Sequence, residues 1–235
     1  MPRPRRATVS EIAYHVLNRC VMRLPIFEKP GDYEAFERVL AEGLKRPDAL
    51  GVLAYCLMPN HWHLVLWPRA GSNLSTWMQW LTVTHTHRWH RRYHCVGEGP
   101  LYQGRFKSFP IQRDGHLLTA MRYVEANALR AGLVERAEAW RWGSLWTRER
   151  GSEQQRAMLS RPPVALPEDW PAVVNRAAGA EELERVRQCV IRGAPLGGKR
   201  WVARTVEALG LEATQRRRGR PRKRKSGTAG VENAT

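Results

Sequence analysis

The chain has 235 residues, enough for one sizeable core or for one domain with an appendage, and its 43% hydrophobic content is ordinary for a globular protein. Four widely spaced cysteines without a C-x-x-C pair argue against a disulfide framework and against a cysteine zinc site. No apolar run has the length of a signal peptide core or of a membrane span. These features predict a protein of the reducing cytoplasm that is neither exported nor anchored in a membrane.

Positive charge dominates the composition. The chain has 39 Lys and Arg residues against 22 Asp and Glu residues, a formal net charge of +17. Residues 214–225, TQRRRGRPRKRK, carry eight of the positive charges, and the rest of the chain is still basic. Such a balance favours a polyanionic partner, most often nucleic acid, over the alternative of a basic protein with a well-solvated surface.

Hydrophobic periodicity and turn residues predict an alternation of strands and helices. Asp32 is the expected N-cap of the first helix, and Pro59-Asn60 separates two strands that pair antiparallel. Residues 95–111 are glycine-punctuated and predict a loop with a short strand near its end. The other predicted elements are strands at 14–19, 50–58 and 61–67 and helices at 32–46, 74–93 and 115–134.

The order β-α-β-β-α, with a further strand near 105–111, predicts an α+β domain of ferredoxin-like type, an antiparallel sheet with helices packed on one face. This domain is expected to span residues 1–150. Residues 151–213 predict a Pro-rich linker and a small helical region, with helices at 180–192 and 199–210. Residues 214–235 form a basic tail without a core pattern, which predicts disorder.

His61 and His63 lie two positions apart in an otherwise apolar run, CLMPNHWHLVLWP (56–68). Because successive side chains of a strand point to opposite faces, both imidazoles would project from one face. Such a pair can bind a divalent metal, but two ligands do not make a site. A purely structural role is the alternative, and for an isolated H-x-H it is the commoner one.

Tyr123 and Asn127 are at i and i+4 of the helix predicted over 115–134, so they share one helix face. A helix laid across the sheet would present a phenol and an amide oxygen to the two histidines. Tyrosine is a competent nucleophile for phosphodiesters when a metal polarises the phosphate. On spacing alone, a Tyr123 that packs in the core and an Asn127 that caps the helix remain open alternatives.

Four separated motifs, in the right order, resemble those of the single-tyrosine HUH transposases, whose name denotes histidine–hydrophobe–histidine. The C-terminal WVARTVEALGLEATQRRRGRPRK (201–223) is similar to the REP-associated branch, which is encoded beside repetitive extragenic palindromes. The resemblance extends from Tyr14 to Lys223. Its motifs are PNHWHLVL (59–66), QGRFKS (103–108), RYVEANALRAGLV (122–134) and WRWGS (140–144).

The resemblance implies a DNA transposase that cleaves and rejoins single-stranded or hairpin DNA of palindromic repeats through a 5′-phosphotyrosine intermediate. Tyr123 would be the nucleophile, and His61, His63 and Asn127 would bind Mg²⁺ or Mn²⁺. Many relatives have proline where this chain has Ala128. Such a protein would be a cytoplasmic, nucleoid-associated monomer or homodimer. The alternative is a non-catalytic, domesticated relative that only binds palindromic DNA.

Arg105 and Lys107 alternate with Phe106, a pattern that predicts phosphate contacts on one side of a strand and a core anchor on the other. Ordinary surface charge is the alternative. The tail resembles an AT-hook, which reads A·T-rich minor grooves, but it could equally be a nonspecific arm that contacts only phosphates. The tail residues expected to contact DNA are Arg216, Arg217, Arg218, Arg220, Arg222 and Lys223.

Overall fold

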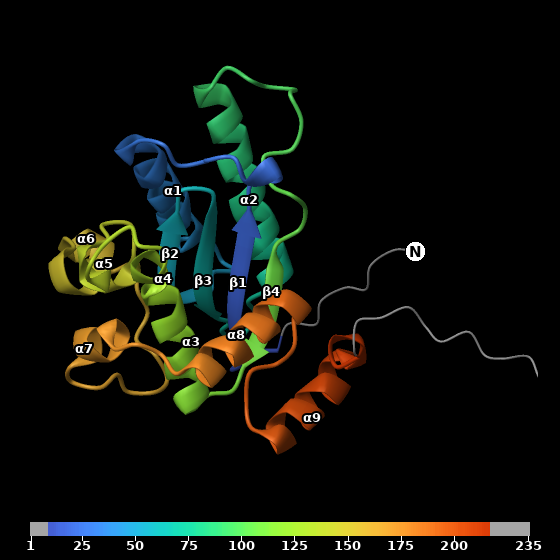
Figure 1. Cartoon of the computed structure of the whole chain (residues 1–235). Coiled ribbons are helices and arrows are strands. Elements are labelled where there is room, and N and C mark those ends of the chain that lie inside the picture. Colours follow the sequence, from blue (N-terminus) through green and yellow to red (C-terminus); the bar gives the residue numbers. More distant parts are fainter. Residues whose placement is uncertain (1–8, 217–235) are drawn as a thin grey trace, which may run out of the picture.

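A four-stranded antiparallel sheet lies at the centre of the chain (Figure 1). The computed structural model describes residues 9–216; residues 1–8 and 217–235 lie outside the described residues. The spatial order of the strands is β2-β3-β1-β4, so the first strand is an interior one. The predicted strands are confirmed, with bounds β1 Ala13–Arg19, β2 Gly51–Met58, β3 His61–Trp67 and β4 Lys107–Ile111.

Strand β3 divides its side chains between two faces of the sheet. Trp62, Leu64 and Leu66 are fully buried on one face, while Val65 belongs to a separate cluster on the other. His61 and His63 share the face of Val65, because residues two apart in a strand point the same way. The register with β1 places His63 opposite Leu17 and His61 opposite Arg19.

Two helices, α1 (Pro30–Gly43) and α2 (Leu74–Arg92), cover the face of Trp62, in agreement with the predicted ferredoxin-like unit. Phe36 of α1 and Trp77 of α2 are fully buried there. The N-cap prediction was wrong, because α1 begins earlier and its N-cap is Lys29. Asp32 lies in the first turn instead, where its carboxylate accepts the backbone N–H of Lys29 at 3.1 Å.

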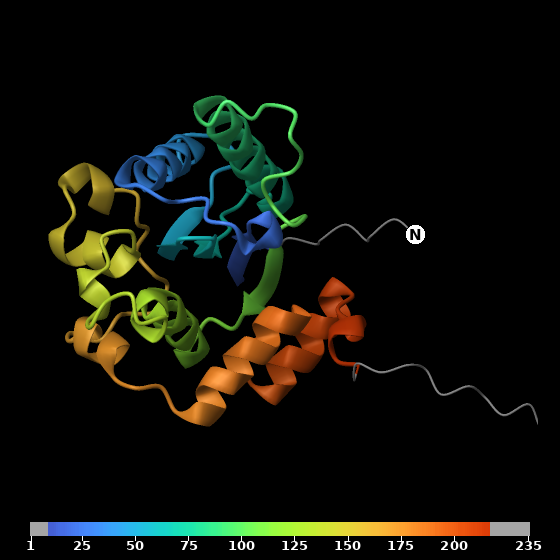
Figure 2. The ribbon, with the colours of Figure 1, turned by 45° about the horizontal axis from the view of Figure 1, so that its top comes forward.

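The second face of the sheet is also covered, which corrects the expectation of helices on one face only. Figure 2 shows α1 and α2 on one side of the sheet and α3 (Gly115–Glu125) and α8 (Ala180–Arg192) on the other. Leu117, Met121 and Val124 of α3 are fully buried against Val65 and its neighbours. The face that carries the histidine pair is therefore an interior face.

The predicted helix over 115–134 is interrupted. Helix α3 ends at Glu125, Ala126 has φ −82° and ψ 7°, and a short helix α4 (Asn127–Arg130) follows. At this break the Tyr123 carbonyl accepts a hydrogen bond from the side chain of Arg130 at 2.6 Å. A side chain thus satisfies a carbonyl at the end of α3, as helix termini require.

The C-terminal segments complete the second core. Trp170, Val174, Val186 and Cys189 are buried in the same cluster as Val65.

The helices predicted over 180–192 and 199–210 are confirmed as α8 and as α9 (Lys199–Leu209). No helix of residues 9–216 is long and apolar enough to cross a membrane. The remaining elements are α5 Ser144–Arg150, α6 Glu153–Arg156, α7 Trp170–Asn175, α9 Lys199–Leu209 and the 3₁₀ turns Val21–Arg23, Ala137–Ala139 and Glu212–Thr214.

His85 of α2 is a buried histidine on the face away from the histidine pair. It is 2% exposed and its Nδ1 lies 2.7 Å from the Tyr102 hydroxyl. Because Trp62 Nε1 donates to the same hydroxyl at 3.0 Å, the Tyr102 O–H is free to donate to His85. Burial lowers the pKa of His85 to about 3, so the imidazole is neutral in the folded protein at neutral pH.

We expect His85 to make folding sensitive to acid. Below about pH 6.5 the unfolded chain protonates this histidine and the folded protein does not, so the free energy of unfolding falls by about 1.4 kcal/mol per pH unit for this group. The wild type should lose stability more steeply than His85→Phe by about that slope between pH 6 and 4. Urea titrations at several pH values measure it, and parallel curves for the two proteins would contradict the assignment.

Candidate active site

The two histidines of β3 lie together beneath α3. Their ring centroids are 5.0 Å apart and their planes are inclined by 77°. His63 is buried, with 5% of its surface exposed, while His61 is half-buried. The interpretation of the H-x-H run as two imidazoles on one pleated face agrees with this geometry.

Burial keeps both imidazoles neutral. Burial, with a smaller contribution from the nearby charge of Arg19, lowers the pKa of His61 to about 4. Burial also holds the pKa of His63 well below its ordinary value, with smaller contributions from His15 and His61. A neutral imidazole has a free nitrogen lone pair, which is the form that binds metals.

Each imidazole is engaged through its Nδ1 atom. His61 Nδ1 lies 2.6 Å from Asn60 Oδ1, and His63 Nδ1 lies 2.9 Å from Nε2 of His15. Within the described part of the chain, neither Nε2 atom has a hydrogen-bond partner. Neither atom is fully buried, since neither is among the buried polar atoms without a partner. Hydrogen bonding within the described chain therefore leaves both Nε2 atoms unoccupied.

Tyr123 of α3 faces the histidines from the helix layer. Its ring centroid is 6.1 Å from that of His63, at 79°, and 6.3 Å from that of His15. The tyrosine is half-buried. The structure thus brings together, within one chain, the phenol and the histidine pair that the sequence motifs singled out.

Asn127 is tied to Tyr123 by an arginine that the sequence analysis missed. The guanidinium of Arg130 lies 4.2 Å from the centroid of the Tyr123 ring and donates to Asn127 Oδ1 at 3.1 Å. The helix break makes this arrangement possible, since Arg130 also donates to the Tyr123 carbonyl. Asn127 Nδ2 is buried without a hydrogen-bond partner among residues 9–216.

The two imidazoles and the Asn127 amide are side chains of kinds that can bind a divalent metal. No group of three His, Cys, Asp or Glu side chains that could hold a metal occurs in the described chain, so the third candidate ligand is sought among amide oxygens. Two neutral histidines whose Nε2 atoms bond no described residue are candidates for two positions. The Asn127 amide oxygen is the third candidate, because one of its two lone pairs is engaged by Arg130 and the other is free.

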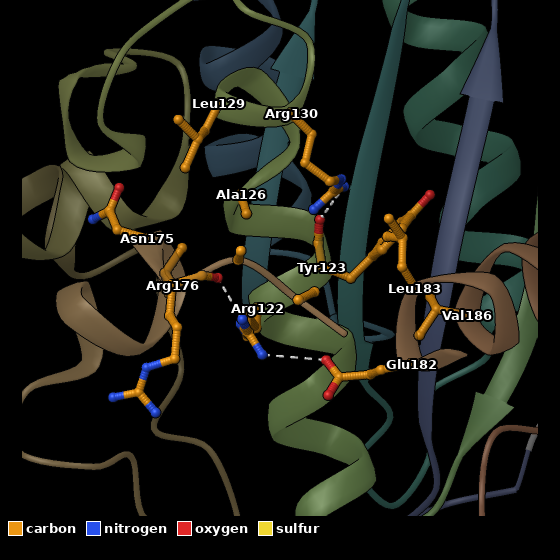
Figure 3. A pocket seen from close by; sticks show the side chains of 13 residues that line it. Arg122, Tyr123, Ala126, Leu129, Arg130, Asn175, Arg176, Glu182, Leu183 and Val186 are labelled. Carbon is orange, nitrogen blue, oxygen red and sulfur yellow. Dashed lines mark hydrogen bonds and ion pairs between the residues drawn. The ribbon is translucent and has the colours of Figure 1, made fainter. Parts of the chain in front are cut away.

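A pocket of about 290 Å³ lies beside Tyr123, between α3, α4, α7 and α8. Figure 3 shows Tyr123 and Arg130 along it and Arg122 reaching Glu182 of α8. Arg122 Nη1 is 3.3 Å from the Glu182 carboxylate, and Arg122 Nη2 donates to the Arg176 carbonyl. These contacts tie the helix that carries Tyr123 to the C-terminal helices.

A second cleft, of about 450 Å³, is basic and lies where β1, β4 and α8 meet. Arg19, Arg105 and Lys107 line it. Arg105 and Lys107 are exposed while Phe106 is buried, as their alternation predicts. Arg19, which the sequence analysis did not single out, forms no ion pair with a described residue, and its Nε is buried without a partner.

The basic tail is largely beyond what the structure describes. Arg216 is exposed at the end of the described chain. The other predicted contact residues of the tail lie outside the described residues, namely Arg217, Arg218, Arg220, Arg222 and Lys223.

Comparison with known proteins identifies the family of the chain. The chain belongs to the family of IS200-like transposases, whose model matches residues 8–127 and so includes the histidine pair, Tyr123 and Asn127. A search of curated proteins gave no match.

Two solved structures are similar to this chain, and one of them has the same fold. The REP-associated tyrosine transposase bound to a REP hairpin is 17% identical, with a TM-score of 0.52 over 64% of this chain and 87% of that chain. A proposed transposase from Deinococcus radiodurans is 14% identical, with a TM-score of 0.37 over 57% of this chain and 96% of the other. The first of these confirms the α+β fold with its antiparallel sheet.

Proposed function

We propose that this protein is a metal-dependent DNA strand transferase that acts on single-stranded or hairpin DNA of palindromic repeats. Tyr123 would attack the DNA, and the intermediate would be a 5′-phosphotyrosine. The observation that carries the proposal is the contact of the Tyr123 ring with His63, beside His61, within one chain. Membership in a transposase family supports the reaction class.

The substrate class rests on two further observations. The protein of similar fold that was solved with DNA is bound to a REP hairpin. The cleft lined by Arg19, Arg105 and Lys107 has no acidic side chain in its lining, which suits the phosphates of a DNA strand. Since one chain supplies both the tyrosine and the histidines, a monomer is sufficient for the reaction. The proposed location is the cytoplasm, near the nucleoid.

The reaction is an exchange of one phosphodiester for another. The Tyr123 oxygen forms a bond to the scissile phosphorus as it gives up its proton to water, and the bond to the 3′-oxygen of the preceding nucleotide breaks. That oxygen takes up a proton and leaves as a 3′-hydroxyl. Because one phosphate ester replaces another, no ATP is needed, and attack by a 3′-hydroxyl on the phosphotyrosine rejoins the strands.

The metal, Mg²⁺ or Mn²⁺, supplies Lewis-acid stabilisation of the negative charge that develops on the scissile phosphate. His61 and His63 would hold it through Nε2, with Asn127 Oδ1 as the third protein ligand. Arg130 orients this part of the site, since it packs on the Tyr123 ring and binds the Asn127 amide at the same time.

The tail would add affinity for the DNA that flanks the hairpin. Arg216, Arg217, Arg218, Arg220, Arg222 and Lys223 surround a Gly-Arg-Pro core. Extended arginines of this kind enter narrow A·T-rich minor grooves.

The rival function is a non-catalytic, domesticated protein that recognises palindromic DNA through the same basic surface. Such a protein has no physical need for neutral, paired histidines beside a tyrosine. Denaturing electrophoresis of a labelled hairpin incubated with Mg²⁺ or Mn²⁺ separates the two functions, because only the strand transferase forms an adduct that survives denaturation.

We expect Tyr123→Phe to abolish the adduct and to leave hairpin affinity within about twofold of wild type, because only a hydroxyl is lost. His61→Ala combined with His63→Ala should likewise lose metal-dependent adduct formation and keep hairpin binding. Tyr93→Phe is the matched control, a tyrosine at the end of α2 whose hydroxyl bonds Asp32. An adduct with Tyr123→Phe would overturn the assignment of the nucleophile.

We also expect the basic cleft to contribute to the salt dependence of binding. Removal of one phosphate-binding side chain should reduce the slope of log affinity against log salt by about 0.7 for a single strand. Arg19→Gln and Lys107→Gln should each show this reduction in fluorescence anisotropy at several salt concentrations. Arg38→Gln is the control, since Arg38 is an exposed arginine of α1 whose ion pair among the described residues is with Glu34 at 3.9 Å. Equal slopes for all three variants would exclude the cleft from the DNA path.

A further inference from the structure

The side chain of Asn60 determines which nitrogen of His61 carries the proton. Asn60 Nδ2 donates to the Arg23 carbonyl at 3.1 Å, which orients the amide so that its Oδ1 lies 2.6 Å from His61 Nδ1. An amide oxygen can only accept a hydrogen bond, so His61 Nδ1 carries the proton. In a neutral imidazole the lone pair is then on Nε2.

His15 stands in the corresponding position for His63. It is fully buried on β1, its ring stacks on Phe109 of β4 at 4.8 Å and 22°, and its Nε2 lies 2.9 Å from His63 Nδ1. One proton is shared between these two nitrogens. If His15 donates, His63 carries its own proton on Nε2 and has no lone pair to offer there. If His63 donates, its Nε2 is free.

We propose that His15 is a positioning residue whose Nε2 accepts a hydrogen bond from His63 Nδ1–H and so keeps His63 Nε2 free for the metal, as Asn60 does for His61. The inference rests on the proposed function, because the ligand of Nε2 is the divalent metal of the strand-transfer reaction. Metal-binding histidines commonly donate their other ring N–H to an acceptor in this way.

The surroundings of His15 argue against a role in packing alone. Its Nδ1 is buried and has no hydrogen-bond partner among residues 9–216. An unpaired buried polar atom is destabilising, and a phenylalanine would fill the space next to Phe109 without it. The core therefore contains an imidazole with an unpaired buried nitrogen at a position where its other nitrogen contacts His63.

Three variants separate the hydrogen bond from the packing. His15→Phe keeps a ring against Phe109 and removes the acceptor. His15→Gln places an amide oxygen near the position of the imidazole Nε2 and restores an acceptor. His85→Phe is the matched control, since it also removes a buried histidine that has one hydrogen-bond partner, on the other face of the sheet.

The first readout is ¹⁵N NMR of the imidazoles in the metal-free protein at pH 7.5. His63 should carry its proton on Nδ1 in the wild type, in His15→Gln and in His85→Phe, and lose that preference in His15→Phe. The second is Mn²⁺ titration followed by electron paramagnetic resonance. We expect His15→Phe to bind Mn²⁺ about 10- to 100-fold more weakly than the wild type, which is the typical effect of removing such a hydrogen-bond partner. His15→Gln should recover most of this affinity, and His85→Phe should bind Mn²⁺ as tightly as the wild type.

A wild-type His63 that carries its proton on Nε2 would overturn the proposal, even if His15→Phe failed to fold. So would unchanged Mn²⁺ affinity in His15→Phe, or an equally weakened affinity in His85→Phe, which would show a general effect of removing a buried histidine. A wild-type protein that binds no Mn²⁺ refutes the metal-dependent function itself. The two failures are distinguishable, because the tautomer is measured without metal.

Discussion

The candidate site depends on one consequence of strand geometry, that residues two apart project from the same face of a sheet. In β3 this places the imidazoles of His61 and His63 side by side, where His63 is buried and His61 is half-buried. Burial makes the charged form of each unfavourable, so both remain neutral with lone pairs available. A single strand and its covering helix thereby hold two neutral imidazoles side by side.

The second requirement is a helix that ends at the right residue. If α3 continued regularly through Asn127, the Tyr123 carbonyl would accept the backbone N–H of Asn127 within the helix. The break at Ala126 instead lets Arg130 bond the Tyr123 carbonyl and the Asn127 amide and cover the Tyr123 ring. The relative placement of the tyrosine and the amide thus depends on a local departure from helical geometry.

The sequence predicted the parts of this site that follow from periodicity and motif. Alternation of side chains predicted the strand of His61 and His63 and the exposure of Arg105 and Lys107 on either side of the buried Phe106. Helical spacing of apolar residues predicted α1 and α2. Periodicity carries no information on how the second face is covered or where α3 breaks. His15 and Arg19 were missed for a related reason, since only the β1–β3 register brings them to His63 and His61.

The identity of the residue that becomes linked to DNA tests the central claim most directly. The adduct formed on a labelled hairpin with Mn²⁺ can be denatured, digested with nuclease and trypsin, and sequenced by tandem mass spectrometry. Trypsin cleaves after Arg122 and Arg130, so Tyr123 lies at the start of the peptide YVEANALR. The account predicts a nucleotide mass on Tyr123 of this peptide, and the same mass on any other residue would contradict it.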